Sequence, residues 1–383
     1  MKVNNFEWRG KKVLVTGASG FKGSWLCAAL HELGARVYGT VRDQIHPDSA
    51  YNTIDLDSRI TKVTGDITNS QKVSDMINSI EPDVIFHLAA KALVPVALRD
   101  PRRAFDVNIM GTLNIVEACR RTSVASRILI TSTDHVFGSV KPNRLPKRGF
   151  PENSRVSYSG PYDTSKSAME LLVRSYHSTY WSELPAIGIT RCANVFGFGD
   201  VNQRRVIPLF LSSAVTSGHI PLKYRNNGRQ FIHITDAIAG YIRAASILNE
   251  GSSKEKLGSS SPNEIPNDIS GRSPFTPTFH FAIESYENTS EPYIRMNALA
   301  DIVARLFNAE VRETSDAIDF APKENPIQAI NCKETRSSIN WEIRKPLQDA
   351  LTEAGAWYLP TATIDDHKQA IQRDIEFILN GLN

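Results

Sequence analysis

The chain has 383 residues, enough for one large α/β domain or two smaller ones with a substantial core. Its net charge of +3, with no long block of Lys and Arg, argues against nucleic acid as a partner, and its four widely spaced cysteines argue against a disulfide framework or a zinc site. No apolar stretch approaches the ~20 residues that span a bilayer, and no apolar signal-peptide core follows Met1, so we expect a cytoplasmic protein with no membrane partner and no bound metal.

The first predicted unit is a strand, a glycine loop and a helix. Residues 12–16 form a short apolar run that stops at a T-G-x-x-G-x-x-G pattern, after which apolar residues recur at helical spacing. We expect Gly17 to form the turn, Gly20 to let backbone amides approach a pyrophosphate, and Gly23 to allow close helix–strand packing. The pattern predicts a dinucleotide site; the alternative is a tight turn of another α/β protein. The residues assigned to the cofactor in this loop are Gly17, Ser19, Gly20, Phe21, Lys22 and Gly23.

Five further strands, with helices between them, continue the pattern, at residues 34–41, 60–67, 83–90, 128–131 and 186–192. This alternation predicts an α/β fold with a Rossmann-type, doubly wound parallel sheet. We assign residues 1–193 to a dinucleotide-binding domain and residues 194–383 mainly to a smaller C-terminal α/β substrate-binding domain. Residues 251–277 are rich in Ser, Asn, Pro and Gly and are predicted to be a mobile surface insertion.

Acidic and small residues at the ends of the third and fourth strands extend the predicted cofactor site. Asp66, followed by Ile67, ends the third strand, where a carboxylate can meet the adenine amino group or can simply cap a turn. Ala89 and Ala90, after Leu88, end the fourth strand with side chains small enough for the backbone to lie against a nicotinamide ribose, and ordinary packing explains them as well.

The end of the second strand bears on the choice between NAD and NADP. Rossmann sheets that bind NAD usually place an acidic residue there to accept from the ribose hydroxyls. Here Arg42 and Asp43 follow Val41, so that Arg42 would hold a 2′-phosphate whereas Asp43 would hold free hydroxyls. The sequence leaves both cofactors open.

The fifth predicted strand ends in a run of polar residues, Ser132, Thr133, Asp134 and His135. Because ligands of parallel sheets bind beyond the carboxyl ends of the strands, we expect these side chains at the edge where chemistry takes place. His87, by contrast, lies inside an apolar strand and is expected to be a core histidine with satisfied hydrogen bonds.

Tyr162 and Lys166 stand four residues apart and therefore share a face of the helix that follows. A tyrosine with its ordinary pKa near 10 is a poor base at neutral pH. A lysine one turn away, together with an oxidised nicotinamide, would favour the phenolate through opposite charge. Tyr162 would then take a proton from a substrate hydroxyl while hydride leaves the carbon that bears it.

These motifs together resemble the extended short-chain dehydrogenase/reductases, the family of nucleotide-sugar epimerases and dehydratases. The matching segments are residues 17–25, Asn108 to Thr112, the Tyr162/Lys166 pair and Arg191 to Asn194. Within the family the pattern is most similar to the CDP-glucose 4,6-dehydratase group, in residues 21–26, 93–94, 194–200 and 204–208.

The resemblance implies a role for each residue at the end of the fifth strand. Thr133 would hydrogen-bond the 4-hydroxyl of the sugar beside Tyr162 and Lys166, and Asp134 stands where the family has the general acid that protonates the departing 6-hydroxyl. The next position is glutamate in dTDP-glucose dehydratases and lysine in the CDP group, whereas this chain has His135, whose ordinary pKa near 6.5 suits a general base. The alternatives are that Asp134 only orients the loop and that His135 caps the strand end or packs beneath the site.

The resemblance also implies the remaining contacts and the reaction. Asn108, together with Tyr162 and Lys166, is assigned to the cofactor, and the substrate-binding residues are Lys91, Val94, Ser132, Asn194, Arg204, Arg205, Val206, Pro208 and Arg229. The expected protein is a homodimeric nucleotide-sugar 4,6-dehydratase with NAD as a recycled cofactor. A 4-epimerase or reductase of the same fold is one alternative, and a non-catalytic NAD(P)-binding regulator is another.

Overall fold

The computed structural model describes residues 6–41, 45–122, 125–248, 276–287, 289–314 and 325–382. Arg42, Asp43 and all of the predicted insertion 251–277 except its last two residues lie outside these ranges. Within them, no helix is both long and apolar enough to cross a membrane. The four cysteines are all buried and free.

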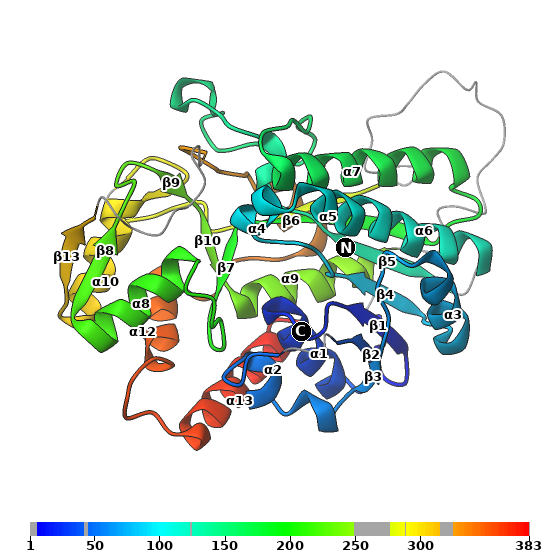
Figure 1. Cartoon of the computed structure of the whole chain (residues 1–383), viewed down its shortest axis with the longest axis horizontal. Coiled ribbons are helices and arrows are strands. Elements are labelled where there is room, and N and C mark those ends of the chain that lie inside the picture. The colour runs from blue at the N-terminus through cyan, green and yellow to red at the C-terminus, as the bar shows by residue number, and fades with distance from the viewer. Residues whose placement is uncertain are drawn as a thin grey trace.

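A seven-stranded sheet forms the centre of the molecule (Figure 1). In spatial order its strands are β11 (Thr278–Phe281), β6 (Ala186–Cys192), β5 (Arg127–Thr131), β4 (Val84–His87), β1 (Lys12–Thr16), β2 (Arg36–Thr40) and β3 (Thr61–Val63). Every neighbouring pair is parallel. The chain runs outward from β1 to β3, returns to β4 and then runs outward in the other direction, which confirms the predicted doubly wound sheet. The switch point between β1 and β4 is where such sheets bind ligands.

Helices cover both faces of this sheet (Figure 1). Those on one face are α3 (Ser70–Ile80), α4 (Val94–Arg99), α5 (Pro101–Phe105), α6 (Gly111–Thr122) and α7 (Pro161–Tyr180). Those on the other are α1 (Phe21–Glu32), α2 (Ala50–Thr53), α9 (Ile234–Ile247), α11 (Lys333–Ile339) and α13 (Ile364–Asn380). In β1, Val13 and Val15 join the core under α1 and α9, whereas Leu14 joins the core under α3 and α6, as expected for alternating side chains. Double coverage explains why the central strands β1, β4 and β5 are mainly apolar and buried, whereas the edge strand β3 is not.

A second, smaller lobe extends from the carboxyl edge of the sheet (Figure 1). It contains α8 (Val206–Ser217), α10 (Met296–Phe307), α12 (Leu347–Ala356) and the parallel pair β8 (His219–Leu222) and β13 (Glu310–Glu313). Two short pairs connect the lobes, β7 (Asn194–Phe196) with β10 (Phe231–His233) and β9 (Gly228–Arg229) with β12 (Ile294–Arg295). The chain after residue 193 serves both lobes, because α9, β11 and α13 return to the large sheet.

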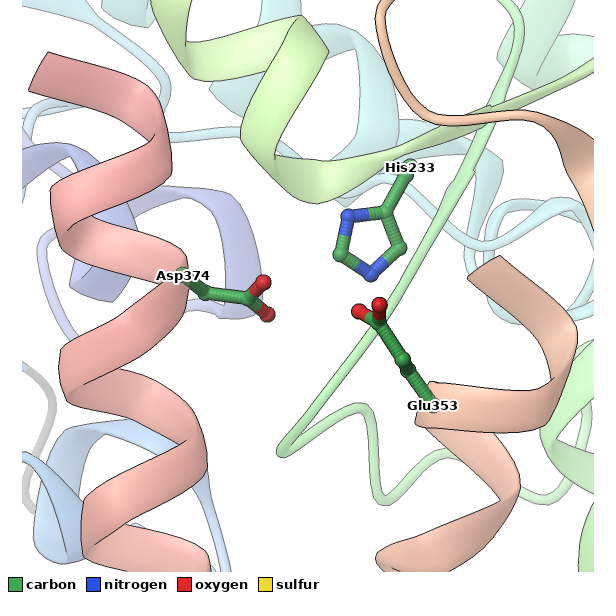
Figure 2. A group of neighbouring side chains, drawn as sticks. All are labelled: His233, Glu353 and Asp374. Atoms are coloured by element: carbon green, nitrogen blue, oxygen red, sulfur yellow. The ribbon is translucent and has the colours of Figure 1, made fainter. Parts of the chain in front are cut away.

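A buried polar cluster fastens the C-terminal helices to this framework. His233 caps the start of α9, because its side chain accepts from the Thr235 amide. Its ring points toward Glu353 of α12 and Asp374 of α13 (Figure 2). The ammonium of Lys345 donates to Asp374 Oδ1 at 2.6 Å and also to Glu353. The chain thus provides its own cation between the two carboxylates, and Lys345 links α12 to α13.

Candidate active site

The glycine loop has the geometry of a pyrophosphate cradle. Gly17 has φ +76°, and a Cβ on it would lie 2.9 Å from the Ala89 amide nitrogen. A Cβ on Gly23 would lie 2.1 Å from the Gly17 carbonyl oxygen. Helix α1 starts after Gly20 with no side chain capping it, so the first amides of the helix remain available to an anion. The loop therefore fits a dinucleotide at the positions assigned to each glycine.

We expect Gly17→Ala to weaken NAD binding. A residue other than glycine in this backbone conformation costs about 1–3 kcal/mol, and the added methyl group must also push the loop away from Ala89. The dissociation constant for NAD, measured by calorimetry, should rise at least about tenfold. Gly218→Ala at the end of α8 is the matched control, because Gly218 has φ +70° but a Cβ there meets no atom within 4 Å. Equal NAD affinity in the two variants would show that the loop is not the cradle.

Both strands end earlier than predicted, β3 at Val63 and β4 at His87, so that Asp66 and Ala89 lie in the loops that follow them. The amides of Leu88 and Ala89 bond the carbonyl and hydroxyl oxygens of Thr16, which holds the small residues Ala89 and Ala90 beside Gly17. His87 is a satisfied core residue between the hydroxyls of Thr16 and Thr112, at 2.8 and 3.0 Å, as predicted. Burial lowers the pKa of His87 to about 3.

Asp66 and Asn108 have structural partners of their own. Asp66 accepts from the Thr68 amide at 3.0 Å and pairs with Arg103 Nη2 at 2.6 Å, which is the turn-capping arrangement, while Ile67 is buried behind it. Burial opposes ionisation, but the Thr68 amide and the Arg103 guanidinium prevail and lower the pKa of Asp66 to about 2.

Asn108 hydrogen-bonds two nearby residues, Lys91 and Ser165. Its Oδ1 accepts from the Lys91 amide at 2.8 Å, and its Nδ2 donates to the Lys91 carbonyl and to Ser165 Oγ at 3.3 and 2.9 Å. Both hydrogens of the Asn108 side-chain amide are therefore used in positioning Lys91 and α7. Direct contact of Asn108 or Asp66 with a cofactor stays a prediction.

The end of β5 brings the predicted reactive groups together with α7. Thr133 is buried, Thr133 Oγ1 bonds Asp134 Oδ1 at 3.1 Å, and a hydrogen bond from Thr133 acts on the Tyr162 hydroxyl. Lys166 donates to the Thr131 carbonyl at 2.6 Å. Tyr162 and Lys166 are both buried on α7, so the strand end and the helix form one site.

Burial is the main cause of the pKa shifts of Tyr162 and Lys166. It raises the pKa of Tyr162, and the Thr133 hydrogen bond only partly offsets this. Burial, with the nearby Lys22 ammonium, lowers the pKa of Lys166 to about 7. The protein groups alone therefore do not favour the phenolate, because desolvation of a charge outweighs its stabilisation by neighbours. A phenolate promoted by a bound nicotinamide stays a prediction.

Asp134 is a buried carboxyl group within this site. It is 4% exposed, and its Oδ2 has no hydrogen-bond partner among the described residues. Burial raises the pKa of Asp134, although the charges of His135 and Arg229 and the Thr133 hydroxyl oppose this. A carboxyl group kept protonated closer to neutral pH is suited to donate a proton.

His135 lies beside Tyr162, with the ring centroids 5.6 Å apart. Its Nδ1 bonds Asp163 Oδ1 at 3.0 Å, and Asn325 Nδ2 donates to the other oxygen of that carboxylate at 3.3 Å. Asp163 and Asn325 are not among the residues predicted from the sequence. Asp163 was signalled only by its place next to Tyr162, and Asn325 comes from a distant loop.

The predicted substrate residues fall into an inner and an outer group. Arg229 is buried and close enough for its charge to act on Asp134 and His135, and Val94 packs in one cluster with Tyr162. Ser132 is buried, and Asn194 donates to the Gln230 carbonyl at 3.2 Å.

The outer group belongs to the start of α8. Arg205 pairs with Asp200 at 2.5 Å, Arg204 is exposed, and Val206 and Pro208 form the first turn of the helix. Lys22 donates to the Tyr241 hydroxyl at 3.3 Å, and the charges of both Arg205 and Asp134 act on it. Phe21 and Ser19 lie in the glycine loop where α1 begins.

A Rossmann sheet with a tyrosine–lysine helix and a threonine at the end of β5 defines a nucleotide-cofactor enzyme class. The sequence profile of the NAD dependent epimerase/dehydratase family matches residues 13–257. The chain belongs to that family, which confirms the predicted resemblance and the predicted NAD dependence at the level of the family.

Individual relatives agree with this assignment. The chain is 30% identical over 247 residues to CDP-glucose 4,6-dehydratase of Salmonella typhimurium, an alignment that covers 63% of this chain and 68% of that protein. It is 26% identical over 336 residues to CDP-paratose 2-epimerase of Salmonella typhi, covering 82% of this chain and 95% of that protein. The crystal structure of DesIV, a dTDP-glucose 4,6-dehydratase of Streptomyces venezuelae with NAD and TYD bound, has a TM-score of 0.71 at 22% identity and covers 91% of this chain and 96% of that chain. At this identity the structural similarity establishes the fold.

Proposed function

We propose that the protein is a nucleotide-sugar 4,6-dehydratase that converts a CDP-glucose-like substrate to the 4-keto-6-deoxy sugar. The observation that carries the proposal is Asp134, a buried carboxyl group with a raised pKa that lies directly beside Thr133 in the tyrosine site. An epimerase needs the tyrosine site and room for the ketone to rotate, but it has no need of a proton donor there. The dehydratase relative supports the same reaction.

In this proposal each side chain moves or holds one proton. Tyr162 takes the proton of the 4-hydroxyl, with Thr133 holding that oxygen and Lys166 supporting the tyrosine. The C4 ketone acidifies the C5 hydrogen, which His135 removes while Asp134 protonates the C6 hydroxyl as it leaves in water. NAD, held at the glycine loop, supplies the oxidation at C4 and the reduction at C6. Arg229 and Asn194 are assigned to the sugar–diphosphate.

The proposal is tested by incubating the purified protein with CDP-, dTDP-, GDP- and UDP-glucose and measuring product masses. Loss of one water, with no net consumption of NAD, is the expected result, and it should be fastest with CDP-glucose. A product with the same mass as the substrate would indicate epimerisation instead of dehydration, in line with the epimerase relative. Bound NAD with no product from any of the four sugars would favour the non-catalytic NAD(P)-binding regulator.

We expect His135→Ala to block the elimination of water but not the oxidation at C4. The variant should retain C4 oxidation, seen as absorbance of the reduced cofactor, but lose exchange of the C5 hydrogen with deuterated solvent. Removal of a general base typically costs about 10²–10⁴-fold in rate. If this variant dehydrates the substrate at the parent rate, His135 is not the base.

We further propose a homodimer that pairs through the outer surfaces of α6 and α7. The support within this chain is Leu171 of α7, a large apolar side chain that is 58% exposed. The cytoplasmic location stays a prediction.

A further inference from the structure

Asp163 connects the first turn of α7 to the histidine of the strand end. It follows Tyr162 in the chain and is 4% exposed. An acidic residue in the first turn of a helix commonly accepts from the free amides there. The carboxylate of Asp163 instead bonds His135 Nδ1 at 3.0 Å with one oxygen and Asn325 Nδ2 at 3.3 Å with the other. A purely capping role therefore does not account for its contacts.

This hydrogen bond fixes which ring nitrogen carries the proton. An ionised carboxylate only accepts, so Nδ1 of His135 must be the donor, which leaves the lone pair of a neutral ring on Nε2. The side chain of His135 is 17% exposed, and Nε2 makes no hydrogen bond to the residues that the structure describes. The ring also stands edge-on to Tyr162 at a centroid distance of 5.6 Å. The side chains of Tyr162 and His135 are therefore close enough to belong to one site.

We propose that Asp163 is a positioning residue that holds His135 in the Nδ1-protonated form, with Nε2 directed to the substrate, and stabilises the imidazolium formed during the reaction. The proposal rests on the proposed dehydration. In that step the C5–H bond breaks and its proton goes to Nε2, while the electron pair forms the C5–C6 double bond. The C6–O bond breaks as Asp134 supplies the proton that completes water. Asp163 keeps the Nδ1 proton in place throughout and does not itself become protonated.

The charges around the ring set the expected pH dependence. Asp134 adjoins His135 in the chain, Asp163 and Tyr162 face it from α7, and Arg229 faces it from β9. Burial opposes protonation, but the Asp163 hydrogen bond and the two carboxylate charges raise the pKa of His135 above its ordinary value. Because the base must be neutral, the dehydration rate should rise with pH through that pKa.

The decisive comparison uses two substitutions at one position. Asp163→Asn keeps an acceptor oxygen but removes the charge, so the acidic limb of the kcat–pH profile should move to lower pH. Asp163→Ala removes both and should lower kcat by about 10²-fold, the lower range for loss of a positioned base, with little change in KM. In both variants C4 oxidation should persist while C5 exchange slows. Asp301→Asn on α10, exposed and far along the chain from the site, is the control and should change none of these.

A second measurement is independent of turnover. Nitrogen-15 NMR of histidine-labelled protein should show His135 protonated at Nδ1 in the parent and should show loss of that preference in Asp163→Ala. An unshifted pH limb in Asp163→Asn, or the same tautomer and titration in parent and Asp163→Ala, would overturn the proposal. If no nucleotide sugar is dehydrated but the NMR result holds, the coupling of the two residues stands and the proposed reaction is what fails.

Discussion

Tyr162→Phe should reduce turnover of the preferred nucleotide sugar by about 10²- to 10⁴-fold, the range for removing a group that transfers the reacting proton. The substitution deletes one hydroxyl in a site where Tyr162 is 7% exposed and the packing is otherwise kept. Lys166 is not placed to replace that hydroxyl, because its ammonium is engaged with the Thr131 carbonyl. Steady-state product formation is the measurement.

The matched control for this prediction lies on the same helix. Tyr176→Phe removes a hydroxyl from a tyrosine whose ring packs against Tyr180 at a centroid distance of 5.3 Å, two turns or more from the site. Its turnover should equal that of the parent. Equal losses in the two variants would mean that the hydroxyl of Tyr162 has no special role and that α7 only supports the fold.

Glu170→Gln should destabilise the fold more than any exposed charge substitution. Glu170 and Arg191 form a two-pronged ion pair, at 2.9 and 2.6 Å, and the two side chains are 0% and 1% exposed. Removing one partner of a buried pair typically costs about 3–5 kcal/mol, because the other charge is left in a low-dielectric environment. The free energy of unfolding in urea should fall by that amount.

The control and the rescue both use substitutions in this chain. Glu310→Gln breaks an exposed pair with Arg312, and the unfolding free energy should barely change, because exposed pairs contribute little. Replacing both Glu170 and Arg191 by Leu and Met should restore much of the lost stability. An unfolding midpoint of Glu170→Gln equal to that of the parent would show that the pair does not stabilise the framework beneath the site.

The local part of the fold and site was predictable from the sequence. The central strands β1, β4 and β5 are mainly apolar runs because helices cover both faces of the sheet, and the glycine spacing directly reflects the backbone of the first turn. The same holds for the tyrosine–lysine pair, which depends only on helical periodicity. Thr133 and Asp134 follow because the end of a parallel strand determines which edge they reach.

The remaining features depend on contacts between distant segments, and no local pattern encodes them. Asn325 reaches Asp163 across 162 positions, and Lys345 meets Asp374 and His233 through folding of the C-terminal helices. Strand β11 joins the large sheet only because β6 offers a free edge. The titration of Tyr162 likewise follows from burial, which spacing does not reveal.

The most direct test of the account follows the hydrogen on C4 of the substrate. The protein is incubated with CDP-glucose that carries deuterium at C4, and the position of the label in the product is determined by NMR. The proposed reaction predicts a 4-keto-6-deoxy product with the deuterium at C6 and one solvent-derived hydrogen at C5. A product of unchanged mass with deuterium still at C4, or deuterium absent from the product, would contradict the dehydratase assignment.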